Sequence, residues 1–455
     1  MSIEKEYKAL LEIEGLYKSR KKNKRTTIVQ LLIALISIMI IISFSIFNER
    51  RIIIMSLGLS LLLIISNIPI RIWVKRIMVT LPFLFVFALG NLLVAQYYLA
   101  ISIMIKGLLC ISIVTILIRN NSMDDICIAL ETLKIPHLFV LQISLLYRYI
   151  FIFSEEFSLM INSYKMRSTV AKGVSIKDVG PFLGSFILRN IDFGEKVYFA
   201  MICRGFNELR GKKSKEIIAK LSNEDRFSIN IKNITIDYGV QAKALDNVSL
   251  NIVEGEKVAL IGSNGAGKTT LISSILNLID FSEGAIDVKG VPVNKDTAQI
   301  IRSYIGLIFQ NPDHQLFKSR VRDDILFGPI NYKLDEKQIE LKLNQLIKIF
   351  NAEKLMDRYI HTLSGGEKRL VALMGVLLLS PKALLMDEPT VYLDGKERRE
   401  LAKYLVTNNL TQIICTHDLD FALDVCNRVI ILNNGKVVAD GKCDVLLRDK
   451  DLLGL

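Results

Sequence analysis

The sequence has few of the side chains that build metal centres or disulfide frameworks. Its six cysteines are scattered and form no C-x-x-C pair, and its four histidines form no cluster. This spacing indicates neither a zinc site nor a disulfide framework. It fits a chain that lives in a reducing, cytosolic environment.

The N-terminal segment lacks the composition of a cleaved signal peptide, because residues 1–27 carry charges of both signs and end in a basic block. The chain is nevertheless apolar, with 51% hydrophobic residues and a mean hydropathy of +0.36. These values exceed those of an ordinary soluble enzyme, and 455 residues leave room for about two or three domains. We therefore expect part of the chain to lie in a membrane.

The net charge of +12 is compatible with nucleic-acid binding by its magnitude alone. Many of the Lys and Arg residues, however, lie beside apolar runs, where positive residues mark the cytoplasmic side of a membrane. We interpret the charge as membrane topology and expect a lipid bilayer, with no nucleic acid, among the partners.

Four apolar runs between residues 28 and 119 are candidate transmembrane helices: 28–47, 52–69, 78–95 and 97–118. The first has about the 20 residues that a spanning helix requires. The basic block before it places residues 1–27 in the cytosol, and an even number of crossings returns the chain there by Arg119. Arg50 and Arg51 would then lie on the outer side of the membrane, which weakens this assignment of crossings because positive residues favour the cytoplasmic side. The sequence predicts a multi-pass protein of the cell membrane with its C-terminal half in the cytoplasm.

Residues 120–210 change to helices that are apolar on one side and charged on the other, beginning with a cap at Ser122. Pro136 is expected to open a helix that runs to Arg167, and Pro181 another that ends near Arg204. Apolar stretches at 138–153 and 182–191 leave the total open between four and six spans. The strongly charged segment 211–226 is predicted to be a linker to a further domain, 227–455.

A phosphate-binding loop is the clearest motif of the chain. The stretch 262–269 fits G-x-x-x-x-G-K-[ST], with an apolar strand before it and a helix after it. Backbone N–H groups of such a loop bind phosphate oxygens, Lys268 adds a charge between the β- and γ-phosphates, and the Thr269 hydroxyl holds Mg²⁺. The residues predicted to bind ATP here are Gly262, Ser263, Asn264, Gly265, Ala266, Gly267, Lys268, Thr269 and Thr270.

An apolar strand at 383–387 ends in two carboxylates, Asp387 and Glu388. Beside a phosphate loop, Asp387 is predicted to coordinate Mg²⁺, directly or through water, and Glu388 to polarise the attacking water. Strands alternate with helices through this half, which indicates an α/β domain around a mainly parallel sheet. The sequence therefore predicts an ATPase.

The run Leu363-Ser364-Gly365-Gly366-Glu367 resembles the signature of ATP-binding-cassette (ABC) ATPases, with Glu367 where Gln is commoner. Ser364 and the glycine amides cap the next helix and direct its positive end at an anion. The resemblance implies that this anion is the γ-phosphate of ATP on a second ATPase domain. That partner is left open between a second copy of the chain and a separate ATPase.

Other positions resemble the same superfamily one by one. Gln310 resembles the glutamine that links Mg²⁺ to the membrane part, and His417 the histidine that senses γ-phosphate. Asp394 resembles the aspartate of the D-loop, and Tyr238 the aromatic residue that stacks on adenine. The resemblance implies catalytic roles for Glu388, His417 and Gln310, with Gln310 also a Mg²⁺ ligand.

Two further stretches, 309–317 and 327–329, are similar to the ATPases of energy-coupling-factor transporters, although His314 departs from the usual acidic residue. Residues 200–205 resemble the A-x-x-x-R-G signature of the T component of these transporters. A basic helix end with a glycine cap gives the same pattern. An earlier copy at 163–168 keeps Arg167 but has neither Ala nor Gly. The resemblance implies coupling helices ending at Arg167 and Arg204, and we expect Arg204 to pair with Asp313.

The sequence as a whole predicts a multidomain chain. An N-terminal all-α membrane domain with amphipathic coupling helices precedes a C-terminal α/β P-loop NTPase of the ABC type. We interpret it as the energy-coupling module of an importer for a vitamin or trace metal ion, working with a separate substrate-binding membrane S component. The alternatives are an ABC half-exporter, which needs six long helices extending into the cytosol, and a membrane-anchored ATPase without a transport role.

Overall fold

The structure is a computed structural model that describes residues 24–43, 70–93, 96–167, 176–206, 228–239 and 243–448. The chain divides into two compact units, Met1–Ser175 and Ile176–Leu455. The last helix before the predicted linker therefore belongs to the same unit as the predicted ATPase domain. The predicted linker itself, 211–226, lies outside the described residues.

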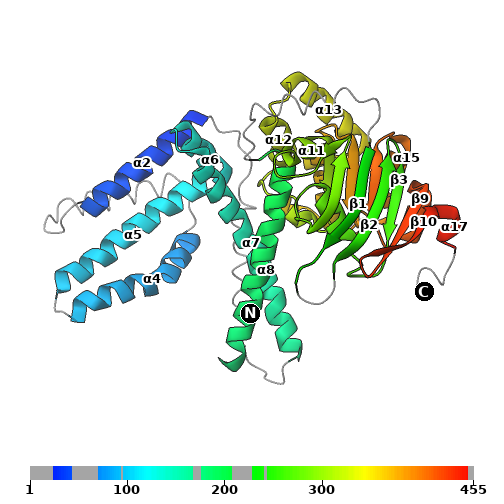
Figure 1. The fold of residues 1–455 in the computed structure, drawn as a ribbon. Helices are drawn as coiled ribbons and strands as arrows, with labels where there is room; N and C mark the ends of the chain where they lie inside the picture. The colour runs from blue at the N-terminus through cyan, green and yellow to red at the C-terminus, as the bar shows by residue number, and fades with distance from the viewer. Residues whose placement is uncertain are drawn as a thin grey trace. The chain divides into compact units, whose positions relative to one another are not determined.

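The first unit is helical where it is described. Its helices are α2 (Lys24–Ser43), α4 (Ile70–Leu93), α5 (Tyr97–Asn120), α6 (Met123–Thr132) and α7 (His137–Arg167). Helix α5 packs against both α2 and α4 (Figure 1). Trp73 on α4 donates a hydrogen bond to the hydroxyl of Ser112 on α5 at 3.0 Å. Gly107 lets the same two helices approach closely, because a Cβ there would lie 2.4 Å from the Leu84 side chain.

Within the described helices, α5 and α7 each contain a stretch long and apolar enough to cross a membrane, at Tyr97–Ile118 and Leu138–Tyr164. Shorter apolar stretches lie at Thr27–Ile41 and Arg76–Asn91. The predicted runs that begin at residues 28, 78 and 97 thus fall on α2, α4 and α5, whereas 52–69 lies outside the described residues. The stretch in α7 begins at Leu138, where the sequence left open whether residues 138–153 cross the membrane.

Helix ends in this region follow local capping chemistry. Ser122 and Asp125 form a reciprocal capping box at the start of α6. Helix α7 starts directly after Pro136, as predicted. Helix α8 (Ile176–Cys203) instead starts before Pro181, which lies inside it. Pro181 is the sixth residue of α8, where it removes one backbone hydrogen bond and crowds the preceding turn, yet the helix extends through it.

The second unit is built on two sheets. A six-stranded sheet has the order β10-β9-β3-β8-β7-β6, with β6 to β9 parallel to β3 and β10 antiparallel to β9. A four-stranded antiparallel sheet has the order β2-β1-β4-β5. The strands are β1 (Ser228–Ile236), β2 (Leu245–Val253), β3 (Lys257–Ile261), β4 (Glu283–Val288), β5 (Val291–Pro292), β6 (Ile305–Ile308), β7 (Ala383–Asp387), β8 (Thr411–Cys415), β9 (Arg428–Asn433) and β10 (Lys436–Lys442).

Helices cover these sheets (Figure 1). They are α10 (Lys268–Ile275), α11 (Ala298–Tyr304), α12 (Val321–Asn331), α13 (Glu336–Ile349), α14 (Gly365–Leu377), α15 (Gly395–Thr407), α16 (Leu419–Val425) and α17 (Cys443–Leu446), with one-turn helices η1 (Pro312–His314), η2 (Glu353–Leu355) and η3 (Ile360–Thr362). Strands β3, β6, β7 and β8 run in parallel, so their carboxyl ends share one edge of the sheet. Ligand sites of open α/β sheets form at that edge.

The C-terminal end of α8 is part of the core of this second unit. Ile202 and Cys203 belong to the hydrophobic cluster that contains residues of β1, β2 and β3. Gly205 adopts a φ of +76°. The Gly205 and Phe206 amides donate to the carbonyls of Ile202 and Met201. This pattern is a Schellman motif, which explains the glycine after Arg204 by helix termination. A Cβ at Gly205 would also lie 3.0 Å from the Tyr332 ring.

Candidate functional site

The phosphate loop connects β3 to α10, as the motif predicts. Gly267, the N-cap of α10, has a φ of +101°. A Cβ at Gly267 would lie 2.4 Å from the Ala244 carbonyl oxygen, and one at Gly262 would lie 2.2 Å from that of Leu432. Both positions therefore require glycine for space, and Gly267 also for its backbone conformation.

The ammonium group of Lys268 lies in the turn of this loop. It donates to the carbonyls of Gly262, at 2.5 Å, and Ser263, at 3.3 Å. It also lies 3.1 Å from Nε2 of His417. The positive charge is thus held inside the loop by two of its backbone carbonyls.

The two predicted magnesium ligands at this loop are in direct contact. The Thr269 hydroxyl donates to Oδ2 of Asp387 at 2.8 Å. Asp387 is the last residue of β7, and its burial raises the pKa of its carboxyl group. A hydroxyl and a carboxylate at hydrogen-bonding distance match the oxygen ligands that Mg²⁺ prefers. The arrangement fits the predicted ion.

Glu388 is held in a strained conformation beside this pair. Its φ is +45°, in the left-handed region that non-glycine residues rarely adopt. Its pKa is raised, mainly by burial. One carboxylate oxygen accepts a hydrogen bond from the His417 amide at 3.3 Å, and the other, Oε1, has no hydrogen-bond partner among the described residues. Strain of this kind clusters at functional sites, and the buried second oxygen lacks the hydrogen-bond donor that buried carboxylate oxygens usually have.

His417 faces the phosphate loop, as its position in the sequence predicts. Its Nε2 lies 3.1 Å from Oδ1 of Asn264 and 3.6 Å from Oε1 of Glu388. The ring is therefore in contact with the loop and with the carboxylate that we expect to polarise water. The ends of β3, β7 and β8 bring these three segments together.

The remaining predicted residues differ in how directly they meet this centre. The Tyr238 hydroxyl is 3.4 Å from that of Thr270, so the exposed ring lies beside the start of α10. Gln310 follows β6, and its side chain is exposed. Asp394 is the N-cap of α15 and accepts hydrogen bonds from the Lys396 and Glu397 amides.

The signature segment forms the N-terminus of α14. Ser364 caps this helix, and the Glu367 carboxylate accepts a hydrogen bond from the Ser364 amide at 2.7 Å. The other oxygen of Glu367 bonds Arg358, also at 2.7 Å. Burial alone would raise the pKa of Glu367, but these bonds lower it overall, so the carboxylate stays ionised. Ser364 is exposed, and this helix N-terminus is therefore accessible to an anion from outside the domain.

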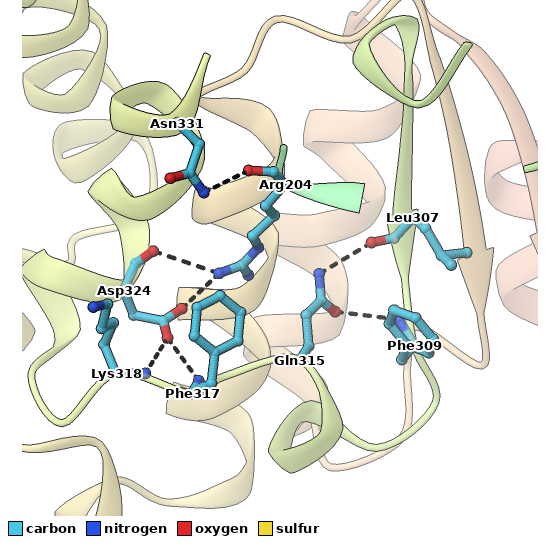
Figure 2. Close-up of polar contacts among 8 residues, drawn as sticks. All are labelled: Arg204, Leu307, Phe309, Gln315, Phe317, Lys318, Asp324 and Asn331. Carbon is cyan, nitrogen blue, oxygen red and sulfur yellow. Dashed lines mark hydrogen bonds and ion pairs between the residues drawn. The ribbon is translucent and has the colours of Figure 1, made fainter. Parts of the chain in front are cut away.

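The predicted pairing of Arg204 with Asp313 is wrong. Arg204 donates to Oδ1 of Asp324, on α12, at 2.7 Å (Figure 2). Asp313 instead binds Lys368 of α14, at 2.8 Å. The one-turn helix η1 directs Asp313 toward α14, whereas Asp324 lies in the first turn of α12 and projects into the pocket that receives Arg204. Arg167 is the last residue of α7, and its side chain lies outside the described residues.

The Arg204–Asp324 pair is buried, with 2% and 0% of the side chains exposed. The second oxygen of Asp324 accepts hydrogen bonds from the amides of Phe317 and Lys318, at 2.8 and 2.9 Å (Figure 2). The guanidinium carbon of Arg204 lies 5.4 Å from the centre of the Phe317 ring. Gly375 of α14 leaves space for it, because a Cβ there would lie 3.1 Å from Nη2.

Two amide side chains fix the walls of this pocket. Asn331 donates to the Arg204 carbonyl at 3.1 Å. Gln315 donates to the Leu307 carbonyl at 3.0 Å and accepts from the Phe309 amide at 3.2 Å (Figure 2). Gln315 therefore ties the segment that follows Gln310 to the end of β6 through both the donor and the acceptor of its side chain. Neither amide was singled out from the sequence, because nothing in the local pattern distinguishes them.

Comparison with known proteins agrees with this geometry. The family described as "ABC transporter" matches residues 245–391, and the family described as "Cobalt transport protein" matches residues 19–215. The ATP-binding protein EcfA of the energy-coupling-factor transporter of Carboxydothermus hydrogenoformans is 40% identical, over 48% of this chain and 83% of EcfA. EcfA of Pediococcus pentosaceus is 38% identical, over 50% of this chain and 83% of that protein.

The chain belongs to the energy-coupling-factor transporters. It combines their membrane component and their ABC ATPase in one polypeptide, as predicted, and it is a membrane protein. Among solved structures, cbiO1 of Clostridium perfringens, described as part of the ABC transporter complex cbiONQ, is 33% identical, with a TM-score of 0.46 over 50% of this chain and 93% of that one.

One residue of this energy-coupling-factor ATPase that the sequence did not single out is Arg369, on α14. Its buried guanidinium donates to the carbonyls of Phe309 and Gln310, and to that of Glu388 at 3.3 Å. Burial lowers the pKa of Arg369 to about 10, so the group stays charged at neutral pH. The sequence feature that could have identified Arg369 is its position as a basic residue shortly after the signature. Its role depends on carbonyls of two segments, 309–310 and Glu388, that are far apart in the sequence.

Proposed function

We propose that this chain is the energy-coupling module of an importer for a vitamin or a trace metal ion. The buried Arg204–Asp324 pair is the observation that carries the proposal. It places the end of α8 inside the ATPase, against the helix whose N-terminus is the signature. A movement of this pocket therefore has a direct mechanical route to the ATP site.

The ATP site of the proposal uses the contacts described above. The amides of 262–269 and Lys268 bind the phosphates, and Tyr238 stacks on the adenine. Thr269, Asp387 and Gln310 would hold Mg²⁺, which would supply positive charge against the developing charge on the phosphates.

Hydrolysis in this proposal needs groups from two ATPase domains. Glu388 polarises the attacking water, and His417 contacts the γ-phosphate. This chain's Ser364, Gly365, Gly366 and Glu367, with Asp394 beside them, are offered to the nucleotide of the second domain, and the second domain offers its own signature to the site at Glu388. The exposure of Ser364 supports this division.

The second ATPase is proposed to be a separate chain. The pocket of this chain's own ATPase is filled by Arg204, so a coupling end at Arg167 needs a pocket on another ATPase. In a pair of identical chains, both pockets would be filled by each chain's own Arg204, and both Arg167 ends would have none. One copy of this chain with one separate ATPase matches two arginine ends to two pockets.

The complex is completed by a substrate-binding S component in the cell membrane. The proposed organisation is a cytosolic N-terminus at 1–27, transmembrane helices in 28–119, coupling helices in 120–210, a linker at 211–226 and a cytoplasmic ATPase domain from 227. The match to a family described as "Cobalt transport protein" supports a metal ion or a metal-containing vitamin as cargo.

The test is purification of the tagged full chain from its native membrane, with identification and counting of the co-purifying subunits. We expect one separate ABC ATPase and a small membrane protein for each copy. Uptake of the candidate cargo should require both partners and fail with Glu388→Gln. A complex with two copies of this chain and no other ATPase would refute the partner assignment. A complex that hydrolyses ATP without supporting uptake of any candidate cargo would refute the importer.

A further inference from the structure

An ion pair outside the ATP site connects α15 to the segment that carries His417. Arg398 donates from Nε and Nη2 to the two carboxylate oxygens of Asp418, at 2.8 and 2.9 Å. About a quarter of each side chain is exposed, 25% and 28%. Two parallel bonds between a planar guanidinium and a carboxylate fix orientation as well as distance. The pair therefore joins two elements rigidly.

Asp418 is fixed from other directions as well. Its carboxylate caps α16 by accepting a hydrogen bond from the Phe421 amide at 2.9 Å, and its amide donates to the Thr416 hydroxyl at 3.0 Å. The bond to Arg398 lowers the pKa of Asp418, so the carboxylate is ionised in the pair. Asp418 directly follows His417 in the chain, so whatever holds Asp418 also sets the backbone of His417.

His417 in turn contacts two groups of the reaction centre. Its amide donates to Glu388, and its ring nitrogen lies 3.1 Å from the Lys268 ammonium. The contacts also extend in the other direction, along α15. Arg398 lies one helical turn after Asp394, and the Arg398 amide donates a hydrogen bond to the Asp394 carbonyl at 2.9 Å. Asp394 caps α15 at an exposed position. A continuous set of contacts thus runs from this exposed helix start to the catalytic centre.

We propose that Arg398 is a positioning residue for ATP hydrolysis, which acts through Asp418 on His417. Arg398 does not touch the nucleotide site itself. It holds the His417 segment against α15, so that the His417 amide and ring keep their distances to Glu388 and Lys268. The inference depends on the ATPase activity of the chain and is independent of which cargo the transporter moves.

The test compares Arg398→Gln with Arg399→Gln in the native membrane complex. Arg399 is the adjacent, exposed residue of α15, so the control makes the same chemical change and the same change of charge. We expect Arg398→Gln to lower kcat about ten- to a hundredfold, as misplacement of a catalytic group does. The KM for ATP and the melting temperature should stay at the control values. Arg398→Lys should recover part of kcat, because one charged bond to Asp418 can re-form.

Two double variants separate positioning from a general structural role. Asp418→Asn keeps an oxygen to cap α16 but removes the charge, and combining it with Arg398→Gln should add little to either single effect. In a His417→Ala background, Arg398→Gln should leave the residual kcat unchanged. The proposal is overturned if Arg398→Gln matches Arg399→Gln in kcat. It is equally overturned if the two effects multiply in the His417→Ala background, or if kcat falls only in proportion to a lowered melting temperature.

Discussion

Replacement of Arg204 by Met is the most direct test of how α8 is held in the ATPase. Removing one member of a buried ion pair costs about 3–5 kcal/mol, because the remaining charge stays buried without its partner. Arg204→Met should lie at the lower end of that range, since Asp324 keeps two amide donors. Asp324→Ala should cost more, because it leaves a buried guanidinium with only the backbone carbonyl of residue 324, at 3.4 Å, and leaves two amides without an acceptor, each amide adding about 1–3 kcal/mol.

The assay is hydrogen exchange of the amides of residues 200–206, measured in the full chain. Local undocking exposes these amides, so a loss of about 3–5 kcal/mol should speed their exchange by roughly two to four orders of magnitude. Lys196→Met on the same helix is the matched control. Lys196 pairs with Asp192 at 2.7 Å, but the two side chains are 39% and 60% exposed, so its loss should change exchange by less than about fivefold.

The reasoning fails if Arg204→Met exchanges like the Lys196→Met control. It also fails if Asp324→Ala destabilises the docked α8 end less than Arg204→Met does, because the two amide hydrogen bonds to Asp324 would then contribute no stability. Adding Asp313→Arg to Arg204→Glu should restore nothing, since Asp313 is engaged by Lys368. Rescue by Asp313→Arg would instead support a direct Arg204–Asp313 pair, which the structure contradicts.

Three further predictions concern the ATPase. In a complex whose partner ATPase site is also blocked, Glu388→Gln should bind ATP normally but lower turnover about a hundredfold or more, measured by nucleotide binding and phosphate release; near-normal turnover would exclude it as the general base. Arg369→Met should lower the unfolding midpoint and kcat together, because three carbonyls lose their donor, and Arg369→Lys should recover part of both; an unchanged kcat would contradict this link. Burial lowers the pKa of His314 to about 4 from 6.5, so the folded state binds fewer protons than the unfolded state between these values. Stability should fall by up to about 3 kcal/mol as pH drops through that window, and His314→Phe should remove this loss in unfolding curves at pH 7 and 4.5.

The ATP site could be predicted because its residues follow strands that share one edge. Each of the segments around Lys268, Asp387 and His417 is recognisable from a few neighbouring residues, and parallel pairing of β3, β7 and β8 brings them together. Local sequence and sheet topology therefore sufficed. The strained φ of Glu388 depends on tertiary contacts and leaves no trace in the sequence.

The partner of Arg204 could not be predicted for the opposite reason. Asp313 and Asp324 are both acidic, and both follow Gln310 within about one to four helical turns. The choice between them depends on which way η1 faces and where α12 begins. Sequence reasoning took the nearer carboxylate, whereas the structure uses the one whose other oxygen is satisfied by two backbone amides. A buried carboxylate needs such donors, and only the fold supplies them.

Helix α14 is the element on which these contacts converge. Gly375 packs against the Arg204 guanidinium, Lys368 binds Asp313, and Arg369 binds the carbonyls of Gln310 and Glu388. The same helix begins at the exposed Ser364. We therefore expect a shift of Arg204 in its pocket to be transmitted along this 13-residue helix to the signature and to the backbone of Glu388 together. The coupling that we propose therefore needs no long relay of side chains, because one helix contacts the Arg204 pocket and the Glu388 carbonyl and begins at the surface that we propose faces the second ATPase.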